Sequence, residues 1–341
     1  MIDYPNKLDI IFDKLNKYGA KPIIVGGFVR DNLLSIKSKD IDIEVFNLSS
    51  YKQLKRILKE FGHINLVGKS FGICKLNLDD LDLDFSLPRK DNKISSGHRG
   101  FSVEINSSLS FKQAASRRDF TINTLGYDPM KKKLLDPFNG KEDLENKILK
   151  AVDLKKFAED PLRILRGIVF CARFEFEMDN RLKKLCSSMI QNKILDELPT
   201  QRIFEEIKKM LIKAKKPSIG FRLLKELSKN SLLNLKEDSL KELLKLIDKI
   251  PTLKLTQKQL NKLTNTILTI IYDSTCQDSL KKELTKITKP FPILQGRDLI
   301  EFGLTPSKDF SSILNKAYQA QIKGEFTDII NAKKYLKKLL P

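Results

Sequence analysis

The run DIDIEVF at residues 40–46 alternates acidic residues with apolar ones, which is the pattern of a β-strand. Side chains two apart on a strand point to the same face, so Asp40 and Asp42 project together where most strands place apolar residues. Two like charges so close are unfavourable unless a cation lies between them. The pattern therefore predicts a strand that carries a metal site, with Asp40 and Asp42 as its candidate ligands and catalytic residues.

A glycine pair precedes this strand, where an apolar run ends and a helix is expected to begin. Gly26 and Gly27 let the backbone approach phosphate oxygens closely, and amides at a helix N-terminus attract anions. Arg30 can add a fork of donors to a phosphate or a sugar. Together with the two aspartates, these residues predict a site for Mg²⁺ and a nucleoside triphosphate.

A second run with the same alternation, LDLDFS, occupies residues 81–86. Asp82 and Asp84 would share one face of this strand, and if it lies beside residues 40–46 one of them could complete an acidic triad. Asp84 is our choice, and a solvated outer face is the alternative for Asp82.

Two adjacent arginines open the motif RRDFTIN at residues 117–123. Neighbouring side chains on a helix point in different directions, so one of Arg117 and Arg118 can face a triphosphate while the other pairs with a carboxylate.

The motif EDPLRILR at residues 159–166 combines a carboxylate with two arginines. Asp160 and Arg163 lie three apart, which suits an ion pair within a helix. The same two groups could instead present acceptors and donors to the Watson–Crick edge of a base. Arg166, one turn further, could reach the triphosphate or the base.

The overall charge points to a polyanionic partner. The chain has 341 residues, a net charge of +20 and a pI of about 9.6, which suits nucleic acid, although many of the lysines could simply be solvated surface residues. Four cysteines and two histidines, with no pair at metal-ligand spacing, argue against a structural zinc site and an HD-type phosphohydrolase. We expect reduced core cysteines, a cytoplasmic location and no membrane segment.

Glycines concentrate before residue 150, and the pattern of apolar residues changes near Glu159. The first part predicts an α/β fold with a small sheet, and the second part is lysine-rich and helical, with helices beginning near Pro161, Pro199 and Pro217. Residues 88–110 read as a mobile loop at the edge of the site. The expected strands are 22–25, 40–46, 64–67, 71–77 and 81–87, and the expected helices in the first part are 6–18, 28–35 and 51–61.

Five successive segments resemble the motifs of the class II tRNA nucleotidyltransferase and poly(A) polymerase family, in the family's order. They read VGGFVRDNLL…DIDIEV, RRDFTINTLGYDP, LLDPFNGKEDLENKIL, EDPLRILRGIVFCARF and LPTQRIFEEIKKML. The resemblance implies an α/β head with the DNA polymerase beta-like nucleotidyltransferase fold at residues 1–150, followed by an all-α neck, body and tail. The helical neck with the nucleotide-selecting motif would span residues 151–215, and the RNA-binding body and tail 216–341.

The resemblance also implies an activity, the template-independent addition of CCA to tRNA 3′ ends from CTP and ATP with Mg²⁺. Asp40 and Asp42 would hold the metals, and the basic helical half would bind the tRNA acceptor arm. Gly27 and Arg30 would contact the nucleotide phosphates and Arg118 the triphosphate, while Asp160 and Arg163 would pair with C or A. Asp136 and Gly140 fall in a motif that resembles a hinge between head and neck.

Three alternatives remain open from the sequence. A poly(A) polymerase shares all five motifs, partial CC-only or A-only addition is also compatible, and a non-catalytic RNA-binding protein would not need the acidic and basic residues together. One departure bears on this choice, because Val169 stands where the family often has a third arginine. Either Arg166 suffices or selectivity for the second base differs.

Overall fold

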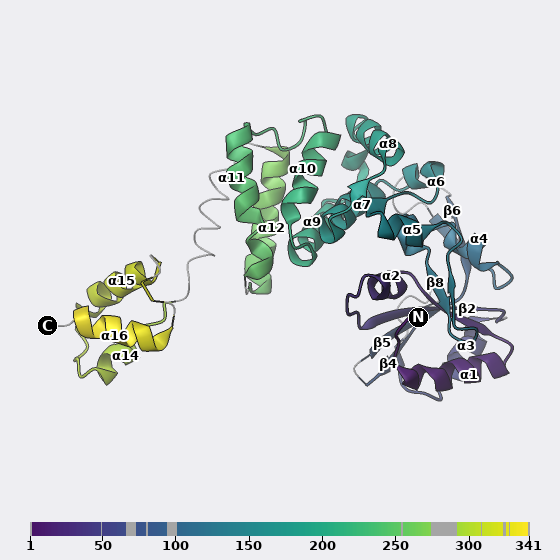
Figure 1. Ribbon diagram of the computed structural model, residues 1–341, viewed down its shortest axis with the longest axis horizontal. Coiled ribbons are helices and arrows are strands. Elements are labelled where there is room, and N and C mark those ends of the chain that lie inside the picture. Colours follow the sequence, from purple (N-terminus) through teal and green to yellow (C-terminus); the bar gives the residue numbers. More distant parts are fainter. Residues whose placement is uncertain are drawn as a thin grey trace. The chain divides into compact units, whose positions relative to one another are not determined.

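The computed structural model describes residues 2–48, 50–65, 73–79, 81–93, 101–253, 255–273, 292–307, 309–322, 325–326 and 328–339. The chain divides into two compact units, Met1–Pro251 with Ile271–Ser274 and Thr252–Ile270 with Thr275–Pro341 (Figure 1). In the ranges described, no helix is both long enough and apolar enough to cross a membrane.

A mixed sheet forms the centre of the head. Its strand order over the described residues is β3–β4–β5–β2–β1–β8–β9, and only β2 and β5 among these neighbours run parallel. The strands are β1 (Lys21–Val25), β2 (Asp40–Phe46), β3 (Ile64–Asn65), β4 (Ile73–Leu78), β5 (Leu81–Ser86), β8 (Gly126–Asp128) and β9 (Lys133–Leu135).

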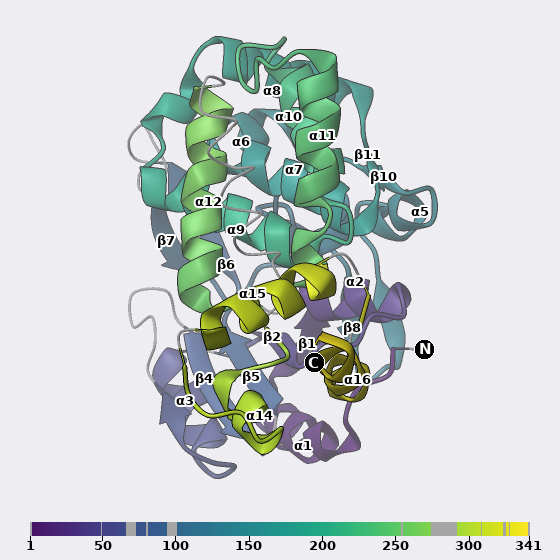
Figure 2. The same ribbon diagram turned by 90° about the vertical axis from the view of Figure 1, so that its left-hand side faces the viewer.

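The two faces of β2 have different partners. Ile41, Ile43 and Val45 are fully buried in a core shared with α1 (Asp9–Lys17) and α3 (Tyr51–Leu58). Figures 1 and 2 show α1 and α3 on the side of the sheet away from α7. By alternation, the acidic residues of β2 occupy the opposite face, which is therefore free to build a site.

Helices make up most of the first unit after the sheet. Helix α7 (Leu162–Phe174) is its central element, and α9 (Thr200–Lys213) and α10 (Pro217–Leu227) pack against it. The remaining helices of this unit are α2 (Gly27–Leu33), α4 (Phe111–Ala115), α5 (Gly140–Glu145), α6 (Leu154–Ala158), α8 (Asn180–Gln191) and α11 (Glu237–Ile247), with short 3₁₀ turns that include η1 (Asn6–Leu8) and η2 (Thr121–Asn123).

The second unit is helical in its described part. It contains most of α12 (Gln257–Tyr272), then α14 (Gly296–Glu301), α15 (Asp309–Ile322) and α16 (Ile329–Leu339). The last three helices enclose a small core of their own around Leu299, Ala317 and Leu336.

The structure confirms the expected strands and helices of the head, with small shifts of their ends. The strand at 40–46 has the predicted bounds, and the expected helix 6–18 divides into a 3₁₀ turn and α1. The expected strand 64–67 is seen as β3, with residues 66–67 outside the described range, and residues 71–72 before β4 also lie outside it. The prolines at 161, 199 and 217 lie at helix starts, as predicted.

The prediction of a loop over residues 88–110 is wrong for most of its described part. Strands β6 (Arg89–Lys93) and β7 (Phe101–Ile105) pair antiparallel there, while residues 94–100 lie outside the described range. The run FSVEI in β7 alternates apolar and polar residues, a strand signal that the surrounding polar residues obscured.

The turn before α5 is closely packed. Asp136 accepts hydrogen bonds from the amides of Gly140 (2.7 Å) and Lys141 (3.0 Å), which satisfies the first amides of α5. A Cβ at Gly140 would lie 2.3 Å from the carbonyl oxygen of Thr121 in η2. Glycine therefore lets α5 touch the backbone of the segment that carries the RRDFTIN motif, and the proposed hinge role of this turn stays a prediction.

We expect Gly140→Ala to destabilise the first unit, because the added methyl would collide with a backbone carbonyl that cannot move without η2. Overpacking of this kind typically costs about 1–3 kcal/mol. Thermal unfolding of the purified variant measures the effect. Gly296→Ala is the control, since nothing lies within 4 Å of a Cβ at that position. Equal melting temperatures for the two variants would contradict the packing argument.

Candidate active site

Carboxylates gather where β2 and β5 run side by side. Their parallel register sets Asp40 beside Asp82 and Asp42 beside Asp84, so all four project from the same face of the sheet. On the next strand, Lys75 is the register partner of Asp84, and its Nζ lies 3.1 Å from Asp84 Oδ2. The sequence predictions for Asp40, Asp42 and Asp84 thus fall in one cluster.

The pKa of the Asp42 carboxyl is raised above its ordinary value. The side chain still reaches solvent, but desolvation by the surrounding protein is the largest cause, and the like charges of Asp84 and Asp40 add to it, while Arg118 and Lys75 act in the opposite direction. A carboxylate that is costly to ionise beside other carboxylates is stabilised by a bound cation. The acidic face therefore favours cation binding.

The two aspartates suit a divalent cation that takes its remaining ligands from water or substrate. Among the described residues, no group of three or more His, Cys, Asp or Glu side chains has the geometry of a metal cage. Mg²⁺ is usually bound by one or two carboxylates together with water and substrate phosphates. Asp40 and Asp42 can supply that part, with a bound nucleotide supplying the rest.

Glu44 is a third acidic residue on the same face of β2, and sequence reasoning missed it. Its side chain is fully buried, and Oε1 accepts a 3.4 Å hydrogen bond from Arg117 Nη2, while Oε2 lies 3.9 Å from Arg118 Nη2. Glu44 thus holds Arg117 by a hydrogen bond and places a negative charge near Arg118. The signal was present in the sequence, since Glu44 continues the alternation of Asp40 and Asp42.

Arg118 lies against the glycine turn. Its Nη1 donates to the carbonyl of Asn123 (2.8 Å), and a Cβ at Gly26 would lie 2.5 Å from this nitrogen. Gly26 also has φ +69°, a conformation that side chains disfavour. Burial lowers the pKa of Arg118, but an arginine remains charged in proteins. Position 26 therefore requires glycine for two reasons: its φ is positive, and a side chain there would collide with the Arg118 guanidinium.

Arg30 is buried and already has internal partners. Its Nε and Nη2 donate to Asp31 Oδ1 (2.8 and 2.6 Å), and its Nη1 donates to Asn123 Oδ1 (2.5 Å). The guanidinium carbon also lies 5.1 and 4.9 Å from the ring centres of Phe170 and Phe174 in α7. Arg30 therefore joins α2 to α7, and the predicted phosphate contact remains a prediction.

Asp119 holds Arg166. Its Oδ2 accepts from Arg166 Nε (2.7 Å) and Nη2 (2.6 Å), and its Oδ1 accepts from Asn123 Nδ2 and the Phe120 amide, each at 2.9 Å. Burial raises the pKa of Asp119, but the Arg166 charge and the hydrogen bonds outweigh it, so the pKa is lowered. The ionised carboxylate fixes the direction of Arg166.

Asp160 and Arg163 lie at the start of α7. Asp160 Oδ1 accepts the amide of Leu162 (3.1 Å), which is a helix-capping contact. Arg163 donates to the carbonyls of Lys156 and Arg117, both at 3.0 Å. The second bond ties the neck helix to the RRDFTIN segment and fixes the position of the guanidinium.

One cavity of about 530 Å³ brings the predicted nucleotide-binding residues together. Asp42 lines it as well, whereas Asp40 lines a neighbouring cavity. Sequence reasoning missed Asn123, which also lines it and whose amide and carbonyl contact three of the charged residues. The predicted residues in the cavity are Gly26, Gly27, Arg30, Arg118, Asp160, Arg163 and Arg166.

We expect Asp42→Asn to raise the melting temperature in the absence of divalent cations, by about 1–3 °C, because it removes a carboxylate that is unfavourable when ionised. The sign follows from the raised pKa. Wild type loses stability as pH rises from the ordinary Asp range through the raised pKa of Asp42, so the difference between the two proteins should shrink in acid. Asp82→Asn is the matched change at another exposed aspartate of the same face. A lower melting temperature for Asp42→Asn would contradict this account.

Part of the chain matches a known protein family, and several curated proteins are similar to it in sequence. Residues 23–150 match the family described as the poly A polymerase head domain. The Multifunctional CCA protein of Neisseria meningitidis serogroup C (strain 053442) is 35% identical over 203 residues, 60% of this chain and 46% of the relative. That of Pseudoalteromonas atlantica is 33% identical over 206 residues, 60% of this chain and 48% of the relative. The chain spans about half the length of the curated relatives it matches.

Solved structures give the same fold. A CCA-adding enzyme in complex with CTP has a TM-score of 0.60 at 21% identity, covering 99% of this chain and 95% of that chain. The Thermotoga maritima CCA-adding enzyme complexed with tRNA has a TM-score of 0.58 at 21% identity, covering 99% and 97%. The chain therefore shares their fold, an α/β head followed by helical regions, and its residues 23–150 match the family described as the poly A polymerase head domain.

Proposed function

We propose that the protein is a tRNA nucleotidyltransferase that adds CCA to tRNA 3′ ends from CTP and ATP without a nucleic-acid template. The observation that carries this proposal is the single cavity lined by Asp42, by Arg118 and Arg166, and by the pair Asp160 and Arg163. A polymerase that selects its nucleotide with protein alone needs three kinds of group. It needs a carboxylate for a metal, cations for a triphosphate and a planar pair of side chains for the edge of a base.

Asp40 and Asp42 would hold Mg²⁺, with Asp84 as the third carboxylate of the site. Bound Mg²⁺ would lower the pKa of the RNA 3′-hydroxyl and offset the charge of the triphosphate. The raised pKa of Asp42 in the protein alone is what a site prepared for a cation should show.

The arginines of the cavity would hold the triphosphate during in-line attack by the hydroxyl on the α-phosphorus, with pyrophosphate leaving. Arg118 is oriented by the Asn123 carbonyl and Arg166 by Asp119, so little reorganisation is needed as charge develops. Helix α2 begins at Gly27, which lines the cavity, so the first backbone amides of the helix could donate to a phosphate oxygen there.

Asp160 and Arg163 would select the base. Their backbone anchors keep the carboxylate and the guanidinium at the start of α7, where both line the cavity. Val169 lies on the same helix and is largely buried, at 9% exposure. Because valine is apolar, it cannot replace the third arginine that the family often has at this position. Arg166, held by Asp119, is the remaining arginine of α7 next to the pair.

The partners follow from charge and from what the relatives bind. The net charge of +20 suits the phosphates of a tRNA acceptor arm, contacted without base readout. The similar solved structures include complexes with CTP, with ATP and with tRNA. Cys74, Cys171 and Cys186 are buried free thiols, which fits the reducing cytoplasm where tRNA is processed.

The direct test offers tRNAs that lack A, CA or CCA to the protein with CTP and ATP, separately and together. We expect each tRNA to be completed to CCA and then to stop, as read on a sequencing gel. A ladder of many adenylates would instead indicate a poly(A) polymerase, and termination after CC or restriction to the last A would indicate a partial activity. Asp42→Ala should abolish incorporation while leaving RNA binding largely intact, and turnover by that variant would contradict the metal assignment.

Base selection by Asp160 can be separated from its structural role. Asp160→Asn keeps an oxygen to cap α7 but changes the pattern of donors and acceptors offered to the base. We expect the ratio of kcat/KM for CTP over UTP to fall by about tenfold or more, with an unchanged melting temperature. Asp160→Ala should lose both selectivity and stability. Unchanged selectivity in Asp160→Asn would show that this carboxylate does not read the base.

A further inference from the structure

Two stacked phenylalanines on α7 lie against three arginines. The rings of Phe170 and Phe174 have centroids 5.8 Å apart, and their planes are inclined by only 14°. The guanidinium carbon of Arg30 lies over both rings, at 5.1 and 4.9 Å from their centroids. That of Arg166 lies 5.8 Å from the centroid of Phe170, and that of Arg173 lies 4.7 Å from the centroid of Phe174. All four distances are within the range in which a ring face attracts a cation, and we call the two rings the aromatic platform.

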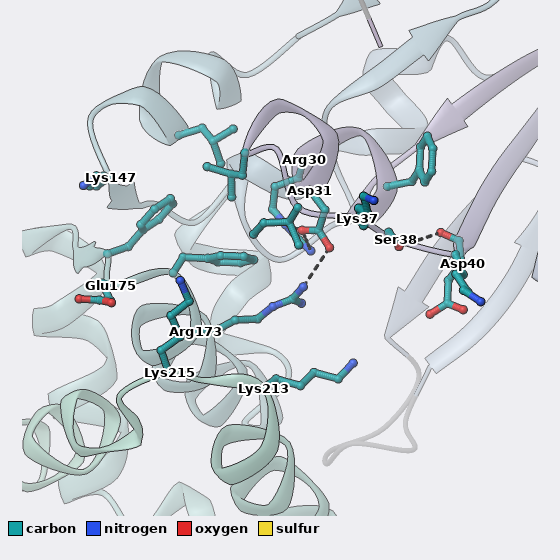
Figure 3. Close-up of a pocket in the computed structure, with 18 of the residues that line it drawn as sticks. Arg30, Asp31, Lys37, Ser38, Asp40, Lys147, Arg173, Glu175, Lys213 and Lys215 are labelled. Atoms are coloured by element: carbon teal, nitrogen blue, oxygen red, sulfur yellow. Dashed lines mark hydrogen bonds and ion pairs between the residues drawn. The ribbon is translucent and has the colours of Figure 1, made fainter. Parts of the chain in front are cut away.

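The aromatic platform extends from the nucleotide cavity into a neighbouring cavity of about 780 Å³. Phe170 lines the nucleotide cavity, Phe174 lines the neighbouring one, and Arg30 lines both. Figure 3 shows the neighbouring cavity, where a dashed line joins Arg173 to Asp31 beside Arg30. The platform therefore lies where the two cavities meet, next to the space that a triphosphate would occupy.

The three arginines on the platform outnumber the carboxylates that pair with them. Arg30 and Arg173 share Asp31, at 2.6 and 2.9 Å. Arg166 pairs with Asp119, also at 2.6 Å. One positive charge of this group is thus left over, and burial together with the like charge of Arg173 lowers the pKa of Arg30. A ring face attracts a guanidinium without neutralising it, so the platform stabilises the excess charge and leaves it available to an anion.

The platform contacts the flat faces of the guanidiniums, which leaves their edges for hydrogen bonds. Arg166 donates Nε and Nη2 to Asp119, and its Nη1 has no acceptor among the residues that the structure describes. Its side chain is 37% exposed, so this edge can reach a ligand in the nucleotide cavity. A further carboxylate in place of Phe170 would compete for the same N–H groups, whereas a ring does not.

We propose that Phe170 and Phe174 are positioning residues that hold the arginines of the nucleotide cavity for the triphosphate through the electron-rich faces of their rings. This inference rests on the proposed nucleotidyl transfer, in which Arg30 and Arg166 contact phosphates. It assigns the effect to the charge distribution of the rings and not to their apolar bulk. Phe170 is the more important of the two, because it lies against both arginines that line the nucleotide cavity.

The test weakens the ring face while keeping its shape. Phe170 is replaced by mono-, di- and trifluorinated phenylalanine, since each fluorine withdraws electron density from the ring face. Binding of CTP and of inorganic triphosphate is measured by calorimetry with Mg²⁺ and without RNA. The same series at Phe157 is the control. Phe157 is fully buried and contacts Phe120 edge-on, as Phe170 does, but no cation lies over its ring among the described residues.

We expect the affinities for CTP and for triphosphate to fall together with each fluorine at position 170, because binding must then order the loosened arginines. The loss should reach on the order of fivefold with three fluorines, the size of one cation–π contact. Phe170→Leu, which keeps an apolar side chain without a ring, should lose at least as much. The Phe157 series should bind both ligands as the wild type does.

A role of Phe170 in packing alone would lower the melting temperature and leave both affinities unchanged, which would overturn the proposal. A loss of affinity for CTP without one for triphosphate would also overturn it, because the ring would then act on the base. Since binding is measured without RNA, absence of incorporation by the wild type would count against the proposed function only.

Discussion

The site depends on one buried residue, Asn123, whose side-chain amide and backbone carbonyl together satisfy three charged partners. Its Oδ1 accepts from Arg30, its Nδ2 donates to Asp119, and its backbone carbonyl accepts from Arg118. Buried charges are costly unless they are paired and hydrogen-bonded, and removing one partner leaves the others exposed to that cost. Asn123 thus lets Arg30, Arg118 and Asp119 lie close together with fixed orientations.

The same network connects the sheet to helix α7. Arg163 donates to the backbone of Arg117, Arg166 pairs with Asp119, and Arg173 pairs with Asp31. These positions are spaced three and seven residues apart, so they lie on one face of the helix. Helix α7, which begins with the proposed base-selecting pair, is thus held along its length against the segments that carry the RRDFTIN motif and the glycine turn.

Much of this arrangement was predictable from the sequence, and the reason is physical. Asp40 and Asp42 interrupt a strand pattern with two like charges on one face, which a cation site explains when the glycine pair and Arg30 precede them. The predicted nucleotide-binding residues all line one cavity, because each belongs to a short motif whose residue types and spacing require a particular local structure.

The residues that sequence reasoning missed act through partners distant in the chain. Asp31 and Asn123 look like ordinary polar residues until folding places Arg173 and Arg30 beside them, and Glu44, although it continues the alternation of β2, has a partner that only folding reveals, Arg117. Nothing in a single sequence gives those pairings. The prediction for residues 88–110 failed differently, because polar composition was given more weight than the alternation in β7.

We infer that the residues proposed to bind the triphosphate and those proposed to select the base form one coupled unit through Asn123. A double-mutant cycle of Asn123→Ala and Arg166→Ala, read as kcat/KM for CTP incorporation into a tRNA lacking CCA, tests it most directly. We predict that the second substitution costs much less once the first is present, with a coupling of at least about 1 kcal/mol. Additive losses, within about 0.5 kcal/mol, would contradict the account.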